Sequence, residues 1–248
     1  MNRVVAAIDN SAAARPVLTM AQAVASALGA TMEAFHVVED GDETASGSAA
    51  AAGVPLQLVS GDPTEQLVLA TEGEDVVGIV LGARGSLGGP LPAGHLVLAI
   101  AGRTDKPVVA VPPGAQPPER LRRVLVAMEG TSNKARALQR TIELSTDAGL
   151  EIIVMHVDEE VPSFTDQVQH EVEAYTSAFF ARHVHGAPEA RLELRIGVPA
   201  VEILHGIESL RPDLVAIGWP QSVDPARAAV AREILARSRV PVLLVAVA

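Results

Sequence analysis

The same pattern occurs twice along the sequence, and this internal repeat constrains the fold more than any other feature. One apolar run ends in Asp9 and is followed by Ser11, and 120 positions later a second run ends in Glu129 and is followed by Thr131. Each copy thus shows an apolar run, an acid, a turn residue and a hydroxyl suited to cap a helix. A repeat of this length predicts two similar domains in one chain.

The elements that follow correspond in the same order. Each first strand leads into an amphipathic segment of helical length, from about Ser11 to Leu28 and from about Thr131 to Ala148, and a glycine follows each, as is common at helix ends. The matched strands after it are 32–38 with 151–157, 58–60 with 194–196, 76–82 with 213–218, and 106–111 with 240–245. Each copy reads β-α-β-(α)-β-α-β-α-β, which predicts a parallel sheet with helices on both faces and right-handed crossovers.

The two copies differ in length between their second and third strands. The second copy has room for a helix from about Ser163 to His185, whereas the first holds a Gly, Ser, Ala and acid stretch from Gly41 to Gly53, which indicates a loop or a vestigial helix. Between the copies, 112–118 has the proline-rich composition of a linker. We therefore expect a first domain at 1–114, a linker at 115–120 and a second domain at 121–248.

Composition excludes several classes of protein. The net charge is −11, which disfavours broad binding to nucleic acids or anionic membranes, and an aromatic content of 2% leaves few platforms for base stacking. The absence of cysteine removes disulfides and thiolate metal sites, and no signal peptide or membrane-spanning stretch is visible. These features favour a cytoplasmic protein.

A glycine-rich segment from Gly82 to His95 is the most informative stretch for function. In an open parallel sheet, ligands bind beyond the carboxyl ends of the strands, and a glycine loop that ends at a helix N-terminus offers backbone N–H groups to an anion. The ordered set of elements, the acid after the first strand, His-Val in the second strand, Gly-x-Pro before a helix and this loop followed by Pro-Val-x-x-Val resembles the universal stress protein family, in tandem over nearly the whole chain.

The resemblance implies a nucleotide site in the first copy. ATP-binding members of the family carry Gly-x2-Gly-x9-Gly-[Ser/Thr], in which the loop holds phosphates, while the first acid and residues of the second strand hold adenine and ribose. Carried over, the candidate ligand-binding residues are Ala7, Ile8, Asp9, Val37, Gly82, Arg84, Gly85, Gly94 and His95. The implied ligand is ATP, alone or with Mg²⁺.

The loop departs from the family pattern in two ways. Its second gap holds eight residues, 86–93, and His95 stands where the family has a hydroxyl, although an imidazole can also donate a hydrogen bond to phosphate. Pro90 and Pro92 restrict the loop and offer no N–H. The second copy lacks the second and third glycines, so we expect no nucleotide there, and we hypothesise that Trp219 fills the space of the missing ligand.

Other conspicuous residues have structural interpretations. The matched positions of His36 and His156 favour packing, and His183 and His185, with His170 upstream, show no metal-ligand spacing and suit a solvated helix end. Asp62 and Glu65 form a capping box. The cluster Arg120, Arg122 and Arg123 is typical of a solvated linker end.

The sequence supplies no catalytic residue. It lacks Gly-x-x-x-x-Gly-Lys-[Ser/Thr], Gly-x-Ser-x-Gly and His-Glu-x-x-His. The leading hypothesis is a stress-response regulator that binds an adenine nucleotide in the first copy and signals to a protein partner. The alternatives are a nucleotide-free scaffold or interaction module and, third, a weak ATPase.

The family resemblance also implies how the copies associate. Dimers of the family pair through their last strands, so 108–111 and 242–247 are the expected contact edges of an internal pseudo-dimer with a pseudo-two-fold axis. Pairing these edges avoids exposed strand groups. Whether two chains form a further homodimer is left open by the sequence.

Overall fold

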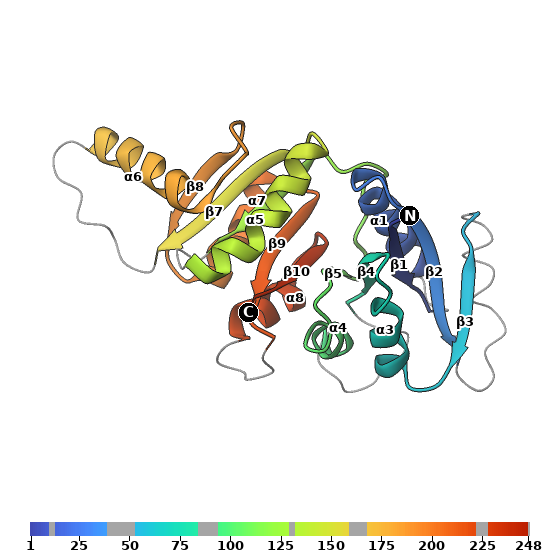
Figure 1. Ribbon diagram of the computed structural model, residues 1–248. Helices are drawn as coiled ribbons and strands as arrows, with labels where there is room; N and C mark the ends of the chain where they lie inside the picture. Colours follow the sequence, from blue (N-terminus) through green and yellow to red (C-terminus); the bar gives the residue numbers. More distant parts are fainter. Residues whose placement is uncertain are drawn as a thin grey trace.

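A computed structural model describes residues 1–9, 13–38, 53–83, 94–128, 132–158, 168–221 and 228–247, without the side chains of 132–136 and 168–173. The first half contains β1 (Arg3–Ala7), α1 (Ala14–Ala27), β2 (Thr31–Val38), β3 (Leu56–Ser60), α3 (Pro63–Thr71), β4 (Val76–Gly82), α4 (His95–Ala101) and β5 (Val108–Val111). The second half contains β6 (Arg123–Ala127), α5 (Ser132–Asp147), β7 (Glu151–Asp158), α6 (Val168–His183), β8 (Arg191–Ile196), α7 (Pro199–Leu210), β9 (Leu214–Trp219), α8 (Ala229–Arg237) and β10 (Val242–Ala246). Figure 1 shows the two halves side by side.

One ten-stranded sheet runs through both halves. Its order, β3-β2-β1-β4-β5-β10-β9-β6-β7-β8, reads the same from either end once the strands are matched by the repeat. All neighbours are parallel except β5 and β10, which pair antiparallel at three positions, with Val109 opposite Leu243. The predicted α/β fold with two parallel half-sheets is confirmed, and so is the pairing of the two halves through their last strands.

The local sequence explains the start of α3 and the ends of α1 and α5. Helix α1 begins after Ala13 without a side-chain cap, and the expected capping residues Ser11 and Thr131 lie outside the described residues. The Asp62 side chain accepts a hydrogen bond from the Glu65 N–H at 3.0 Å, which confirms the predicted cap of α3. Helices α1 and α5 are followed by Gly29 and Gly149, which adopt φ of +60° and +68° and so end the helices in a left-handed conformation. The predicted extra helix of the second half is α6.

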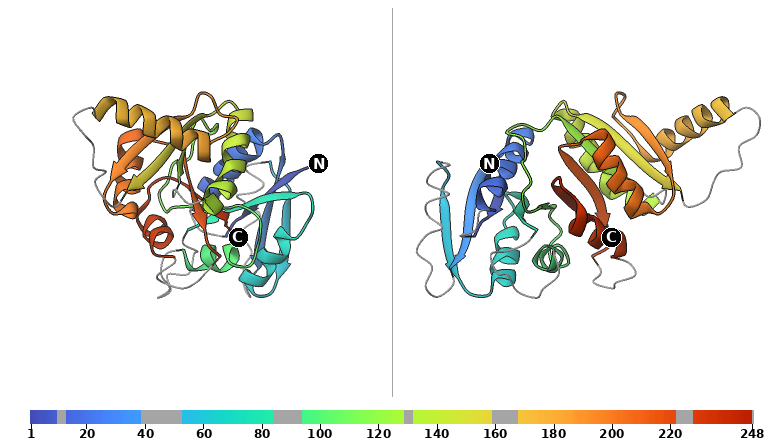
Figure 2. Two further views of the ribbon diagram at one scale, coloured as in Figure 1. Left: turned by 60° about the vertical axis from the view of Figure 1, so that its left-hand side comes forward. Right: turned by 180° about the vertical axis from the view of Figure 1, so that it is seen from behind.

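Helices cover both faces of the sheet (Figure 2). Helices α1, α5 and α6 pack on one face, and α3, α4, α7 and α8 pack on the other, each set over its own apolar cluster. The central strands are apolar without alternation, as expected for strands that are buried on both faces. None of the helices in the described part of the chain has the length and hydrophobicity to cross a lipid bilayer.

The arginines that start β1 and β6 tie the central strands to their neighbours. Arg3 pairs with Glu33 of β2, and its counterpart Arg123 pairs with Glu151 of β7 at 2.7 Å. Arg123 also donates to the carbonyl of Leu210 at 2.6 Å. Arg123 of the basic cluster therefore has a structural contact inside the second half rather than a free position at a linker end.

The predicted linker is anchored to the core at one residue within it and at the residue that follows it. Its composition favours turns, yet Ala115 and Leu121 are buried in the same cluster as α1 and α5. A further contact joins the halves, because the Gln221 side-chain amide donates to the Thr104 carbonyl at 2.9 Å. Most of the predicted linker is at least partly exposed, so the domain bounds proposed from the sequence stay a prediction.

Candidate nucleotide-binding edge

The carboxyl ends of β1, β2 and β4 bring the predicted site residues of the first half to one edge of the sheet. Ala7 stands opposite Phe35 of β2 and Leu81 of β4. Asp9 follows β1, Val37 lies near the end of β2 and Gly82 ends β4, so all three lie at the edge where open parallel sheets bind ligands. Ile8 is buried, while Asp9, Val37 and Gly82 are partly exposed.

Two hydrogen bonds fix the segment that carries Asp9. The Ile8 N–H donates to the carbonyl of Phe35 at 2.9 Å, and Nδ1 of the buried His36 lies 2.9 Å from the carbonyl of Ile8. In the second half, His156 Nδ1 lies 3.0 Å from the carbonyl of Met128 in the same way. The packing role predicted for the two histidines is confirmed: each holds the chain as it leaves the first strand.

Gly94, at the end of the glycine loop, makes a backbone hydrogen bond that the sequence motif did not predict. Its N–H donates to the carbonyl of Ala83 at 2.8 Å, so this backbone donor is engaged within the protein. Gly94 has φ +81°, and a Cβ there would lie 3.3 Å from Leu235 of α8, so a glycine suits both the turn and the contact between halves. His95, the first residue of α4, is exposed beside it, whereas Arg84 and Gly85 lie outside the described residues.

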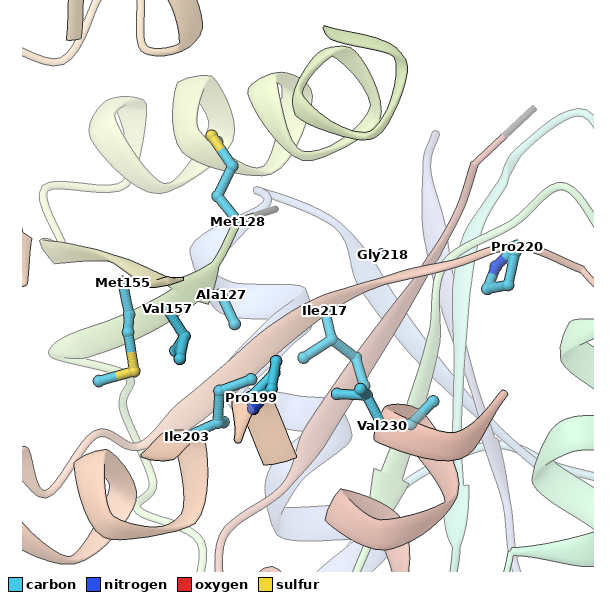
Figure 3. Close-up of a pocket in the computed structure, with 11 residues that line it drawn as sticks. Ala127, Met128, Met155, Val157, Pro199, Ile203, Ile217, Gly218, Pro220 and Val230 are labelled. Carbon is cyan, nitrogen blue, oxygen red and sulfur yellow. The ribbon is translucent and has the colours of Figure 1, made fainter. Parts of the chain in front are cut away.

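The equivalent edge of the second half holds a small apolar pocket (Figure 3). Its volume is about 80 Å³, and it lies between the ends of β6, β7 and β9 and the helices α7 and α8. Val157, Ile203 and Ile217 line it, and none of its described lining residues carries a charge. The pocket occupies the counterpart of the predicted nucleotide edge, but its described lining offers no polar side chain to hold a phosphate.

Two residues shape this pocket that the sequence did not single out. Met155 of β7 lies against α7 at Gly206, where a Cβ would come within 2.2 Å of its Cε. A side chain at 206 would therefore displace Met155 from a position that lines the pocket. In the sequence, this contact is marked only by a glycine inside a predicted helix, where glycine is otherwise unfavourable.

Trp219 is fully buried beside the pocket. Its neighbours Gly218 and Pro220 line the cavity, while Trp219 belongs to the apolar cluster on the α7 and α8 face. Among the described residues, its Nε1 has no hydrogen-bond partner. The hypothesis that this ring fills the space of a nucleotide stays a prediction.

The histidines near the end of α6 differ in their surroundings. His183 packs on Phe179, with ring centroids 4.9 Å apart, and Phe179 in turn contacts His156. Burial lowers the pKa of His183 below its usual value, and the nearby Arg182 adds to this effect. No group of three or more metal-ligating side chains occurs within the described residues.

The depressed pKa of His183 predicts a pH dependence of stability. Because the unfolded chain binds this proton more readily than the folded protein, His183 lowers the free energy of unfolding as the pH falls below about 6.5. We expect His183→Gln to remove this part of the acid sensitivity, in urea titrations between neutral and mildly acidic pH. The exposed His185→Gln is the control, and equal pH profiles for His183→Gln and the wild type would contradict the prediction.

The strand order, the helices on both faces and the ligand edge beyond the strand ends define a doubly wound α/β protein that occurs in two fused copies. The chain belongs to the universal stress protein family, whose model matches residues 120–246. A search of curated proteins gives no match.

Two solved structures have the same fold over essentially the full chain. A universal stress protein from Archaeoglobus fulgidus is 18% identical, with a TM-score of 0.67 and coverage of 98% of this chain and 97% of that one. A Pseudomonas aeruginosa protein assigned to the same family is 14% identical, with a TM-score of 0.72 and coverage of 100% of this chain and 94% of that one. At these identities the likeness concerns the fold.

Proposed function

We propose that this protein is a stress-response regulator that binds an adenine nucleotide, ATP, at the carboxyl edge of its first half. The observation that carries the proposal is the convergence of Asp9, Val37 and Gly82 from three strands on one edge of the sheet. Membership of the family supports the choice of ligand. The apolar pocket of the second half supports the choice of half, because it lacks a charged lining residue among those described.

The chemistry of the described residues suits the parts of a nucleotide. The Asp9 carboxylate can accept hydrogen bonds from ribose hydroxyls, and the partly exposed Val37 offers an apolar contact for adenine. Since the N–H of Gly94 is bonded to Ala83, phosphate contacts fall to the exposed imidazole of His95 and to the remaining loop. Bound Mg²⁺ would offset phosphate charge in a chain whose net charge is −11.

The proposed regulator acts through contact between its halves. Gly94, at the end of the glycine loop, lies close to Leu235 of α8 in the second half. A change in the loop on nucleotide binding would therefore alter the packing of α8. A protein partner then recognises the nucleotide-bound conformation of the two halves. This route gives the second half a role in regulation without a nucleotide of its own.

The two copies provide a matched test of the site. We expect Asp9→Ala to weaken binding of Mg-ATP about tenfold or more, which is the usual effect of losing a charge-assisted hydrogen bond, while Glu129→Ala at the repeated position leaves it unchanged. Calorimetric titration measures both, and mass spectrometry of the denatured protein identifies any nucleotide that was carried through purification.

Other outcomes would change the conclusion. A loss of binding in Glu129→Ala but not in Asp9→Ala would move the site to the second half. No released nucleotide and no binding at millimolar ATP would favour the alternative function, an interaction module without nucleotide.

A further inference from the structure

A second cavity lies between the two halves, far from the nucleotide edge. Its volume is about 520 Å³, within the range of small-molecule sites, and it lies over the central strands between α1 and α5. These helices flank the β5–β10 pair on one face of the sheet (Figure 1). Asn2 and Lys106, which precede β1 and β5, place the cavity at the amino ends of the strands.

One wall and the floor of the cavity are apolar. Val24 and Ala27 of α1, with Leu28 directly after the helix, form the wall from the first half. Val109 of β5 and Leu243 of β10, which stand opposite each other in the sheet, lie beneath it. A ligand with a hydrocarbon body would bury its surface against this side of the cavity.

The opposite wall, on α5, carries two hydroxyls. Thr141 and Ser145 are four residues apart and therefore share one face of the helix, and Ser145 is only 7% exposed. Neither hydroxyl has a hydrogen-bond partner among the described residues. By contrast, the hydroxyl of Thr146 on the same helix donates to the carbonyl of Ile142 at 2.9 Å.

The repeat shows that this polar wall is particular to one copy. The residues 120 positions earlier, on α1, are Ala21 and Ala25, and both are buried. Since alanine is sufficient for packing at these two positions of α1, packing alone does not require hydroxyls at the same positions of α5. The hydroxyls of Thr141 and Ser145 are therefore available as donors to a ligand in the cavity.

The charged side chains of the lining favour an anionic ligand over a cationic one. The Lys106 ammonium has no ion pair or side-chain hydrogen bond among the described residues. Arg140 is already paired with Glu143 at 3.1 Å, and Glu74 is the one acidic side chain among the described lining residues. The lining thus holds three donor groups, those of Lys106, Thr141 and Ser145, which suits a carboxylate because a carboxylate only accepts hydrogen bonds.

We propose that this cavity binds an amphipathic carboxylate of medium chain length, such as a fatty acid, with its chain along α1 and its carboxylate toward Lys106 and the hydroxyls of α5. The site is separate from the nucleotide edge. Its test therefore succeeds or fails independently of the proposed function.

Three probes with the same chain and different heads test the proposal on the full chain. We expect decanoate, at concentrations where it is monomeric, to bind at least about tenfold more tightly than decanol or decyltrimethylammonium in calorimetric titrations. Equal affinity for the three probes, or no binding of decanoate, would overturn the proposal.

Variants locate the site. Lys106→Gln should weaken decanoate binding about tenfold and Glu74→Gln should strengthen it, while Arg103→Gln, which removes an exposed charge outside the lining, should leave it unchanged. Ala148→Phe should abolish binding by filling the cavity, with circular dichroism confirming that the variant is folded. Unchanged binding in both Lys106→Gln and a folded Ala148→Phe would show that decanoate binds elsewhere.

Discussion

Trp219→Ala is expected to lower the free energy of unfolding by about 3–5 kcal/mol, the usual cost of deleting a large buried aromatic side chain. Trp219 is fully buried and belongs to an apolar cluster that includes Ile217 and Leu235. The strand around it is held in place, since the N–H of Val247 donates to its carbonyl at 2.8 Å. The backbone therefore cannot collapse easily into the vacated space.

Trp219→Phe separates the packing of the ring from its polar atom. An unpaired buried donor costs about 1–3 kcal/mol, and the indole N–H has no acceptor among the described residues. Phenylalanine loses some volume but removes this donor, so we expect it to cost about 1 kcal/mol or less. Urea unfolding followed by circular dichroism measures both variants, because each lacks the sole tryptophan of the chain.

A large cost of Trp219→Phe would contradict the prediction. If Trp219→Phe destabilised the protein as much as Trp219→Ala, the indole N–H would have a hydrogen-bond partner in solution. The ring would then be placed by that bond and not by packing. The hypothesis that it fills the space of a lost nucleotide would lose its physical basis.

The repeat made most of the fold predictable. Apolar runs, glycines after helices and the Asp62 cap are local signals, and each appears where the sequence predicted it. The convergence of Asp9, Val37 and Gly82 also follows from sequence, because the carboxyl ends of parallel strands share one edge of a sheet. The β5–β10 pair was implied by the family resemblance, and it also avoids two exposed strand edges.

The features missed by the sequence depend on contacts between distant residues. The engaged N–H of Gly94 and its contact with Leu235 arise from packing between the halves, which no local pattern records. The burial of Ala115 was missed because proline-rich composition reports turn propensity and not what an apolar residue between the turns contacts. The cavity at Lys106 requires both halves and so has no signature in either copy alone.

The junction between the halves gives the second large expected effect. Leu244 of β10 stands opposite Val108 of β5, and both side chains are at most 1% exposed. Leu244→Asp loses the packing of a core leucine and also buries a carboxyl group without an arranged partner, so we expect a cost of about 5 kcal/mol or more. That cost is comparable to the whole stability of many domains.

The single tryptophan allows the effect to be followed in each half. Trp219 reports only on the second half by fluorescence, whereas circular dichroism reports on both. We expect Leu244→Asp to show an unfolded-like fluorescence spectrum without denaturant, together with residual secondary structure from the first half. Leu58→Asp is the matched control, because Leu58 is 57% exposed on the edge strand β3 and the same change should cost little there.

The outcome also decides how the halves depend on each other. Residual structure in Leu244→Asp would mean that residues 1–114 fold as a domain, as the repeat predicts, even when β5 loses its partner strand. Complete loss of both signals would mean that β5 and β10 complete a single folding unit, with Ala115 and Leu121 as part of its core. A native spectrum by both probes would contradict the expected cost and would imply that the sheet does not need the β5–β10 pair to hold the second half together.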